Sequence, residues 1–243
     1  MTRSLILAAL LSSAAAVLAQ PALDQRLLVA SPTMIEADPA LLERMVELAE
    51  PALAQHCSSC HGETLEGTHG IPNLVDHEWI WGVTGFEVTT VEPVHQIMQT
   101  ILFGIRDTEC PDDVKQYGAC PDTRYSEMPA YSNLGFSDQQ IDDLVDWVLD
   151  LAGWPADATA VTRAQEVAAI CIECHGEDGT GFKPFGGPDL TDDIWLYGDS
   201  RDEIRDVIAH GRKGTCPAWF DRLDPVTIKS IAAYLFMRSQ EML

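Results

Sequence analysis

The chain of 243 residues contains the pattern Cys-x-x-Cys-His twice, at residues 57–61 and 171–175. This pattern is the attachment signal for haem c. Two cysteines with two residues between them can both bond the edge of one porphyrin, and the following His then lies under the iron as an axial ligand. The chain therefore has to fold around two covalently bound haem c groups. The residues that we expect to hold them are Cys57, Cys60, His61, Cys171, Cys174 and His175.

Other uses of a Cys-x-x-Cys pair fit this chain less well. A zinc site needs further Cys or His residues at ligand spacing near each pair, and neither pair has them. A redox-active dithiol of the thioredoxin type follows a strand in a βαβ pattern, which is absent here. Two copies of the pattern, each with the following His, favour haem and a function in moving electrons.

The N-terminus has the features of a secretory signal peptide at residues 1–19. Arg3 provides a positive charge, residues 5–18 are apolar, and small residues precede a cleavage site that we place after Ala19. The apolar run is short for a membrane span, which needs about 20 residues, but an uncleaved anchor is the alternative. No other stretch is long enough to cross a bilayer, so we expect no transmembrane span after cleavage. We expect a periplasmic location, where haem c is attached in bacteria.

The chain is strongly acidic, with a formal net charge of −23. This charge excludes nucleic acid as a partner, because phosphates would be repelled. A redox partner protein with a basic docking surface would be attracted, with an association rate that falls as salt rises. The alternative is that the acidity only keeps the protein soluble.

The two halves of the sequence repeat each other. Pro-Asn-Leu at 72–74 and Trp-Ile-Trp-Gly at 79–82 match Pro-Asp-Leu at 188–190 and Trp-Leu-Tyr-Gly at 195–198. A segment of helical period follows in both halves, and each half ends in a capped helix. No segment alternates at period two. We therefore predict an all-α fold, a tandem duplication of two class I cytochrome c domains at 20–153 and 156–243.

The register of the repeat places an insertion in the first half. Gly104 and Gly211 are 107 residues apart, whereas Met128 and Cys216 are 88 apart, so the first half has 19 extra residues within 105–127. Cys110 and Cys120 lie in this insertion, and in an oxidising compartment we expect them to form a disulfide. Two free thiols are the alternative. A loop of this kind over a haem edge could set the choice of partner.

Met128 is the predicted second axial ligand in the first half, opposite His61. It precedes Pro-Ala and the last helix of that half, and a thioether suits iron(II). The alternative is a Met that packs in the core.

Cys216 occupies the equivalent position in the second half, opposite His175. It is the one cysteine left when four are assigned to haem and two to the disulfide. A thiolate ligand stabilises iron(III) and lowers the potential. The alternatives are a five-coordinate iron, ligation by His210, and a disulfide between two chains.

The second half resembles the C-terminal cytochrome domain of the dihaem subunit (subunit III) of cbb-type haem–copper oxidases. The resemblance rests on Gly-Pro-Asp-Leu-Thr-Asp at 187–192, Trp-Leu-Tyr-Gly at 195–198, Gly-Arg-Lys-Gly at 211–214 and Pro-Ala-Trp at 217–219. The first half is less similar. In that family the residue before Pro-Ala is the Met ligand, which implies this role for Met128 but not for Cys216. Those subunits also have a long N-terminal membrane span, and His/Cys haems occur in exported sulfur-oxidising cytochromes.

The main functional hypothesis is a periplasmic dihaem cytochrome c that transfers electrons between partner proteins. The haem of His61 and Met128 would have the higher potential and that of His175 and Cys216 the lower. A second hypothesis is an enzyme that oxidises sulfur compounds, similar to thiosulfate dehydrogenase, with Arg212 and Lys213 holding an anion. A third is an electron-transfer subunit of a dehydrogenase or oxidase complex.

Overall fold

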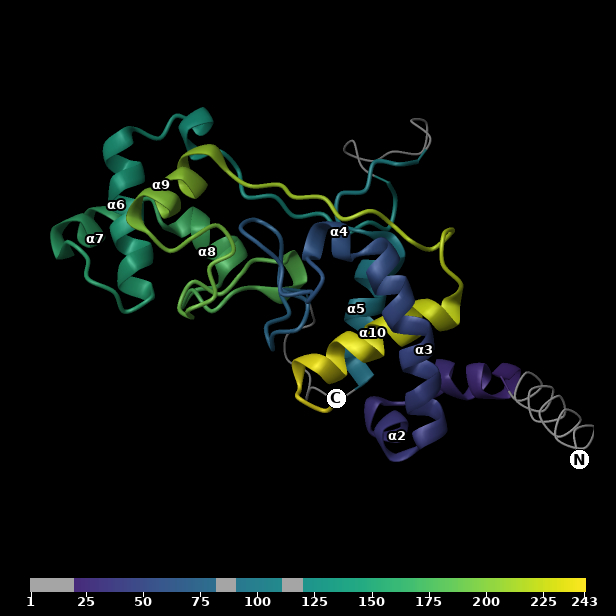
Figure 1. The fold of residues 1–243 in the computed structure, drawn as a ribbon. Coiled ribbons are helices and arrows are strands. Elements are labelled where there is room, and N and C mark those ends of the chain that lie inside the picture. Colours follow the sequence, from purple (N-terminus) through teal and green to yellow (C-terminus); the bar gives the residue numbers. More distant parts are fainter. Residues whose placement is uncertain (1–19, 82–90, 111–119) are drawn as a thin grey trace, which may run out of the picture.

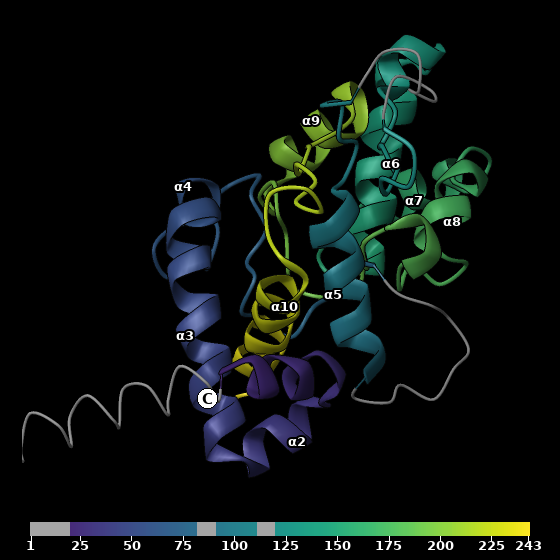
Figure 2. The same ribbon diagram turned by 90° about the vertical axis from the view of Figure 1, so that its right-hand side faces the viewer.

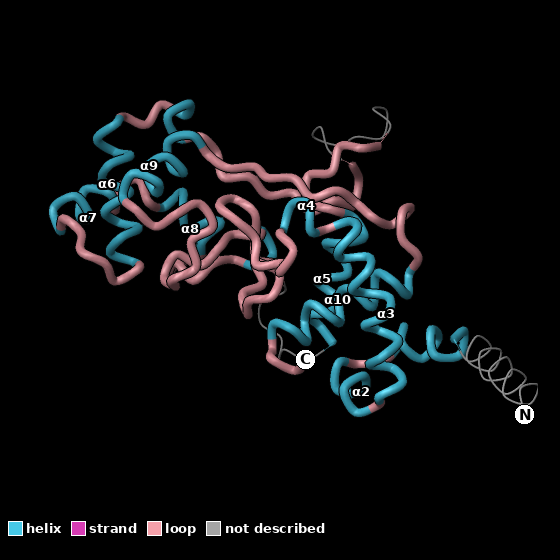
Figure 3. Tube along the Cα trace, in the orientation of Figure 1, coloured by secondary structure: helices cyan, strands magenta, loops and turns pink. Residues whose placement is uncertain are grey.

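A computed structural model describes residues 20–81, 91–110 and 120–243, with only the backbone at residues 91 and 92. The described residues form helices and loops, and their only β-type pairings are isolated bridges (Figures 1 and 3). This confirms the predicted all-α fold. Residues 20–29 are helical, and the signal peptide expected at 1–19 lies outside the described residues. The labelled helices are α2 (Pro32–Ala37), α3 (Pro39–His56), α4 (Ser58–His61), α5 (Val91–Phe103), η1 (Tyr131–Leu134), α6 (Asp138–Leu151), α7 (Ala158–Ala164), α8 (Ala169–His175), η2 (Lys183–Phe185), α9 (Arg201–His210) and α10 (Pro225–Ser239).

The ends of these helices follow from local sequence. Ser137 and Ser200 each cap a helix and form a capping box with the residue three positions later. Asp38 and Asp224 cap α3 and α10, and a proline follows each of them at the first helical position, where its missing N–H costs nothing. The sequence therefore predicts where the last helix of each half begins.

The helices form two hydrophobic cores. The first core combines α3, α5 and α10 around buried side chains such as Met45, Ile97 and Ile231. The second combines α6, α7, α8 and α9 around side chains such as Leu144 and Ile208. Figures 1 and 2 both show α10 beside α3 and α5, and α6 among the helices of the second core.

The last helix of each half thus packs in the core of the other half. Helix α6 ends the first repeat but belongs to the core of the second haem motif, and α10 ends the second repeat but belongs to the core of the first. The boundaries 20–153 and 156–243 therefore describe the repeats of the sequence and not the units of packing. The reason is that both connecting segments cross from one core to the other.

The two crossing segments run side by side. One joins α5 to α6 and the other joins α9 to α10, and both are visible as loops between the two cores (Figure 3). Ile105 and Cys216 form an antiparallel bridge at one end, and Met128 and Arg212 form another at the opposite end. The paired backbones satisfy each other's N–H and C=O groups while the chain passes between the cores.

Ion pairs fix α6 in the second core. The Asp143 carboxylate, 5% exposed, pairs with Arg163 of α7 at 2.5 Å, and the Asp146 carboxylate, 6% exposed, pairs with Arg201 of α9 at 2.6 Å. In the sequence repeat, the matching positions of α10 hold Ser230 and Ala233, so α10 offers these arginines no carboxylate. Charge complementarity therefore favours α6 over α10 in this core.

Within the described ranges, no helix has both the length and the apolar character that crossing a bilayer requires.

Candidate functional site

The two Cys-x-x-Cys-His motifs lie in equivalent local structures. The first includes α4 and the second lies on α8, and in both the helix ends at the motif His and is followed by a glycine. None of the four motif cysteines is in a disulfide. The helical turn brings both thiols of each motif to one side of the chain, as attachment to one porphyrin requires.

Each motif His is held by a backbone carbonyl. The Nδ1 atom of His61 lies 2.8 Å from the carbonyl oxygen of Pro72, and that of His175 lies 2.9 Å from the carbonyl oxygen of Pro188. A carbonyl can only accept, so Nδ1 carries the proton and Nε2 keeps its lone pair for a metal. This is the outer hydrogen bond that orients metal-binding imidazoles.

His175 is the more buried of the two imidazoles. His175 is 8% exposed, and this burial lowers the pKa of its imidazole. The lowered pKa keeps the ring neutral, which is the form that binds iron.

Cys216 faces the first motif. The pKa of its thiol is raised to about 11, mainly by burial and to a smaller extent by the nearby Cys57, Cys60 and Asp107. Its backbone pairs with Ile105, directly after α5 of the first core. The candidate ligand from the second half therefore lies near the cysteines of the first motif.

Met128 lies with the second motif. Its side chain packs against the core that includes Cys171 and Trp195, and its backbone pairs with Arg212 after α9. The expected pairs, His61 with Met128 and His175 with Cys216, are therefore wrong: the structure places Cys216 with the first motif and Met128 with the second. The physical reason is the crossing of the two connecting segments, which carries each ligand loop to the other core.

Two glycines permit the crossing segments to approach closely. Gly104 has φ +71° and Gly211 has φ +69°, both in the left-handed region. A Cβ atom on Gly104 would overlap the carbonyl oxygen of Cys216, and one on Gly211 would overlap that of Met128. These glycines align in the sequence repeat, and each lies against the ligand loop of the other half.

Two buried donors of the first half fit a haem group. Trp79 Nε1 and Arg106 Nε are buried and have no hydrogen-bond acceptor among the residues described. In contrast, Trp195 Nε1, at the matching position of the second repeat, donates to the carbonyl oxygen of Asp192 at 3.1 Å. The propionates of a bound haem are acceptors that the two unpartnered donors would find, since buried polar groups are nearly always paired. The residues present therefore fit the cofactor.

The loops that follow the two motifs touch each other. Gly70 N–H donates to the carbonyl oxygen of Leu196 at 2.7 Å, and the ring of His69 meets the ring of Tyr197 edge-on at 6.2 Å between centroids. Trp81 packs against Gly186, where a Cβ atom would meet its ring. The two candidate cofactor sites are therefore neighbours. No pattern in the sequence predicts the contact between the two loops.

Other residues singled out by sequence have structural roles. Cys110 and Cys120 are joined by a disulfide with a Cα–Cα distance of 5.8 Å, and the residues between them, 111–119, lie outside the described part. His210 is exposed on α9 and its Nδ1 lies 2.8 Å from Asp206, so the structure does not bring it to either motif as a ligand. Arg212 pairs with the same carboxylate at 2.6 Å and stacks on Tyr197.

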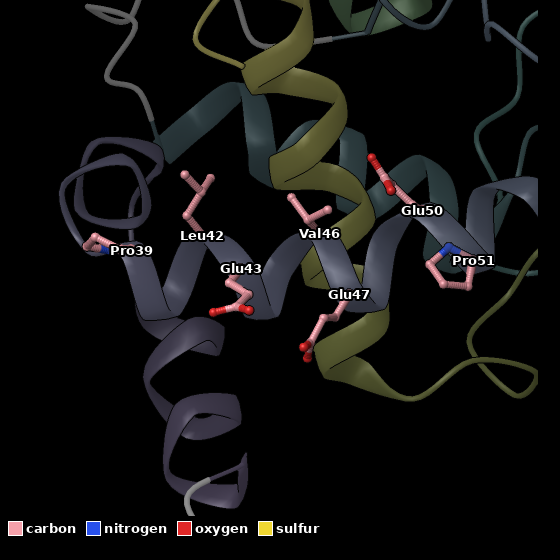
Figure 4. A pocket seen from close by; sticks show the side chains of 7 residues that line it. All are labelled: Pro39, Leu42, Glu43, Val46, Glu47, Glu50 and Pro51. Atoms are coloured by element: carbon pink, nitrogen blue, oxygen red, sulfur yellow. The ribbon is translucent and has the colours of Figure 1, made fainter. Parts of the chain in front are cut away.

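A shallow groove follows one side of α3 (Figure 4). Its lining side chains are Pro39, Leu42, Glu43, Val46, Glu47, Glu50 and Pro51. They include no thiol, thioether or imidazole. We therefore assign no redox chemistry to this groove, and the two motifs remain the candidate site.

Comparison with known proteins finds a matching family model and similar proteins. The family model described as cytochrome C oxidase, cbb3-type, subunit III matches residues 46–148 and 158–235. The chain is 36% identical over 219 residues to the cbb3-type cytochrome c oxidase subunit CcoP of Cereibacter sphaeroides, covering 89% of the chain and 69% of the relative. It is 38% identical over 203 residues to subunit FixP of Azorhizobium caulinodans, covering 83% and 62%. The chain spans about two thirds of the length of these relatives.

Proposed function

Because the chain belongs to the family of subunit III of cbb3-type cytochrome c oxidases, we propose that it is a dihaem cytochrome c that transfers electrons between redox partners outside the cytoplasm. Both haem c groups are bound covalently, one at each Cys-x-x-Cys-His motif. When bound, haem c supplies reversible one-electron chemistry, and the protein contributes ligands, burial and docking.

The ligand sets follow the crossed arrangement. The first haem is held by Cys57, Cys60, His61 and Cys216. The second is held by Cys171, Cys174, His175 and Met128. A thiolate favours iron(III) and a thioether favours iron(II), so we assign the lower potential to the first haem and the higher potential to the second. This reverses the order expected from the sequence repeat alone.

One observation carries this assignment. The backbone of Cys216 is hydrogen-bonded to Ile105, which follows α5 of the first core. The backbone of Met128 is hydrogen-bonded to Arg212, which follows α9 of the second. With the opposite pairing, each ligand would have to leave its bridge and return to the core of its own half. The bridges and the exchanged helices support the crossed pairing together.

An optical redox titration of the purified holoprotein, combined with electron paramagnetic resonance of the oxidised form, tests the proposal. We expect two haems, two separate potentials, and one low-spin signal of the thiolate type. A colourless protein, or two identical His/Met signatures, would contradict it.

The relatives' names favour a partner in an oxidase complex over a stand-alone enzyme. CcoP and FixP are oxidase subunits, and we propose that this chain delivers electrons to an oxidase of that kind. The proposed carrier is exported by the leader at 1–19, and its formal charge of −23 suits a donor with a basic docking surface. Copurification from membranes with the other oxidase subunits is the expected result, and purification of the full chain alone from the periplasm would contradict it.

The sulfur-oxidising alternative has less support. It needed Arg212 and Lys213 to hold an anion, but Arg212 is already paired with Asp206 and Lys213 is exposed. No observation among the described residues favours this alternative over the carrier.

A further inference from the structure

Arg124 is a partly buried cation with no carboxylate partner in the described part of the chain. Its Nη2 donates to the main-chain oxygen of Gln96 at 3.0 Å and to the Oε1 atom of the same residue at 2.6 Å. Its Nε and Nη1 atoms have no acceptor there. Desolvation lowers the pKa of Arg124 to about 10, and no charged side chain of the described residues contributes to this shift. A partly buried cation without a counter-charge is costly to the fold, which suggests that something else supplies the negative charge.

Among the described residues, three other arginines stack on aromatic rings. Arg238 lies over Tyr234 and donates to its hydroxyl, and the other two each pair with a carboxylate. Arg212 lies over Tyr197 and pairs with Asp206, and Arg222 lies over Trp219 and pairs with Glu109. Arg124 lies 5.0 Å from the centre of the Trp81 ring but has no such carboxylate. The stacking holds the guanidinium plane in place and leaves its remaining donors available.

Arg124 also lines a cavity of about 440 Å³. The other residues of the lining are Trp81, Gln96, Gln99, Asp122, Thr123, Tyr125 and Pro184. Thr123 Oγ1 accepts a hydrogen bond from the backbone of Asp107, so its own hydrogen is free to donate into the cavity. Asp122 also lines the cavity, but it is exposed and forms no ion pair with Arg124 among the described residues. The cavity therefore combines one fixed cation and neutral donors with one exposed carboxylate.

We propose that this cavity is an oxyanion-binding site, in which Arg124 and Thr123 hold a carboxylate or a small oxyanion against the face of Trp81. Two sources can supply that chemistry: a free anion from solution, or a propionate of the first haem. The propionate alternative rests on the haem proposed at His61. The backbone of Arg124 pairs with Ile105, and Ile105 also pairs with Cys216, the ligand proposed for that haem.

The test uses the holoprotein and three variants. R124Q removes the charge, R124K keeps it, and R222Q is the matched control because it removes an arginine that also stacks on a tryptophan but already has a carboxylate partner. Calorimetric titration with thiosulfate and with succinate in a low-chloride buffer measures binding of a free anion. A redox titration of the same samples measures the potential of each haem, and the visible spectrum shows independently that both haems are present.

Three results are distinguishable. If the anion is free, the wild type binds one equivalent, R124Q weakens binding at least about tenfold, and R222Q stays within about twofold, because a charged hydrogen bond is worth about 1.5–3 kcal/mol. If a propionate fills the site, no added anion binds, and R124Q lowers the potential of one haem while R222Q does not, because losing a nearby positive charge favours iron(III). If R124Q neither loses anion binding nor changes a potential, the proposal is overturned. If R124Q does not accumulate as folded protein, R124K replaces it in the same measurements. A smaller change in anion affinity or haem potential than expected for R124Q would support the proposal. An R124K protein identical to the wild type in both would overturn it.

Discussion

Ile105 and Cys216 exchange both of their backbone hydrogen bonds, with N···O distances of 2.8 and 2.9 Å. Ile105 follows the middle helix of the first repeat, and Cys216 precedes the last helix of the second. This pairing places the candidate thiolate ligand of the second repeat near the motif cysteines of the first. Met128 and Arg212 are paired in the same way at 2.9 Å in each direction.

Replacing Cys216 with Met should give both haems a His/Met ligand set. A thioether favours iron(II), so the lower of the two potentials should rise while the other stays unchanged. An optical redox titration measures both. Cys216→Ser is the control, since it keeps the side-chain size, removes the thiolate and should leave one iron without a strong second ligand. Identical spectra for wild type and Cys216→Met would show that Cys216 does not bind iron.

Replacing Gly104 with Ala should disturb the loop that presents Cys216. The new Cβ would overlap the Cys216 carbonyl oxygen, and the backbone at φ +71° adds strain. We expect loss of the thiolate signal in electron paramagnetic resonance. Gly135→Ala is the matched control, because Gly135 also has a positive φ, +89°, but its Cβ would meet nothing within 4 Å. An equal effect of both substitutions would assign the change to backbone strain and not to the Cys216 contact.

Replacing Asp146 with Asn should destabilise the second core. The Asp146 carboxylate, 6% exposed, accepts hydrogen bonds from both terminal nitrogens of Arg201 and from the backbone N–H of Asp157. Loss of this buried charge should lower the free energy of unfolding by about 1–3 kcal/mol at pH 7, as measured by urea denaturation. Asp150→Asn, on the same helix but exposed, should change it by less than about 0.5 kcal/mol. Equal effects of the two substitutions would argue against a specific role for the pair.

The contribution of Asp146 should disappear in acid. Its hydrogen bonds to Arg201 hold its pKa below the ordinary value of 3.8, so the folded state binds a proton less readily than the unfolded state. The stabilisation is therefore complete above pH 3.8 and is lost as the pH falls through the lower folded-state pKa. The difference in unfolding free energy between wild type and Asp146→Asn should shrink over that window. A difference that stayed constant into strong acid would contradict the ion-pair explanation.

The cysteine inventory makes a separate prediction. With four cysteines bonded to haem, as proposed, and Cys110 bonded to Cys120, a denatured, unreduced holoprotein should be alkylated once, at Cys216. Peptide mass spectrometry identifies the position. Three alkylated cysteines would show that the disulfide is absent, and none would show that Cys216 is itself in a disulfide.

The sequence predicts the helices well because they depend on short-range patterns, and the proposed cofactor residues rest on a short-range pattern too. Capping residues such as Ser137 fix where helices begin, and the Cys-x-x-Cys-His spacing specifies attachment and the proximal His. The exchange of α6 and α10 is a long-range property. The repeat shows that Met128 and Cys216 are equivalent, but equivalence does not say which core each ligand loop reaches.

The sequence contains the acidic residues that favour α6 in the second core, but it does not distinguish them from other acidic residues. Asp143 and Asp146 are acidic residues on the buried side of a helix, and their partners Arg163 and Arg201 lie in the other half of the chain. Many acidic residues occur in this chain, so these two are distinguished only by their burial. Similarly, the sequence does not distinguish Arg124 from the other arginines, because its lack of a carboxylate partner among the described residues depends on the fold.

The crossed ligand pairs can be tested most directly in a protein that keeps only one covalent haem. The double variant Cys57→Ala/Cys60→Ala holds a haem covalently only at residues 171–175, which mass spectrometry verifies. Electron paramagnetic resonance and the visible spectrum then report the ligands of that haem. We predict a His/Met haem and loss of the thiolate signal, with the opposite result for Cys171→Ala/Cys174→Ala. A thiolate signal that persists in the first variant and disappears in the second would contradict the crossed arrangement.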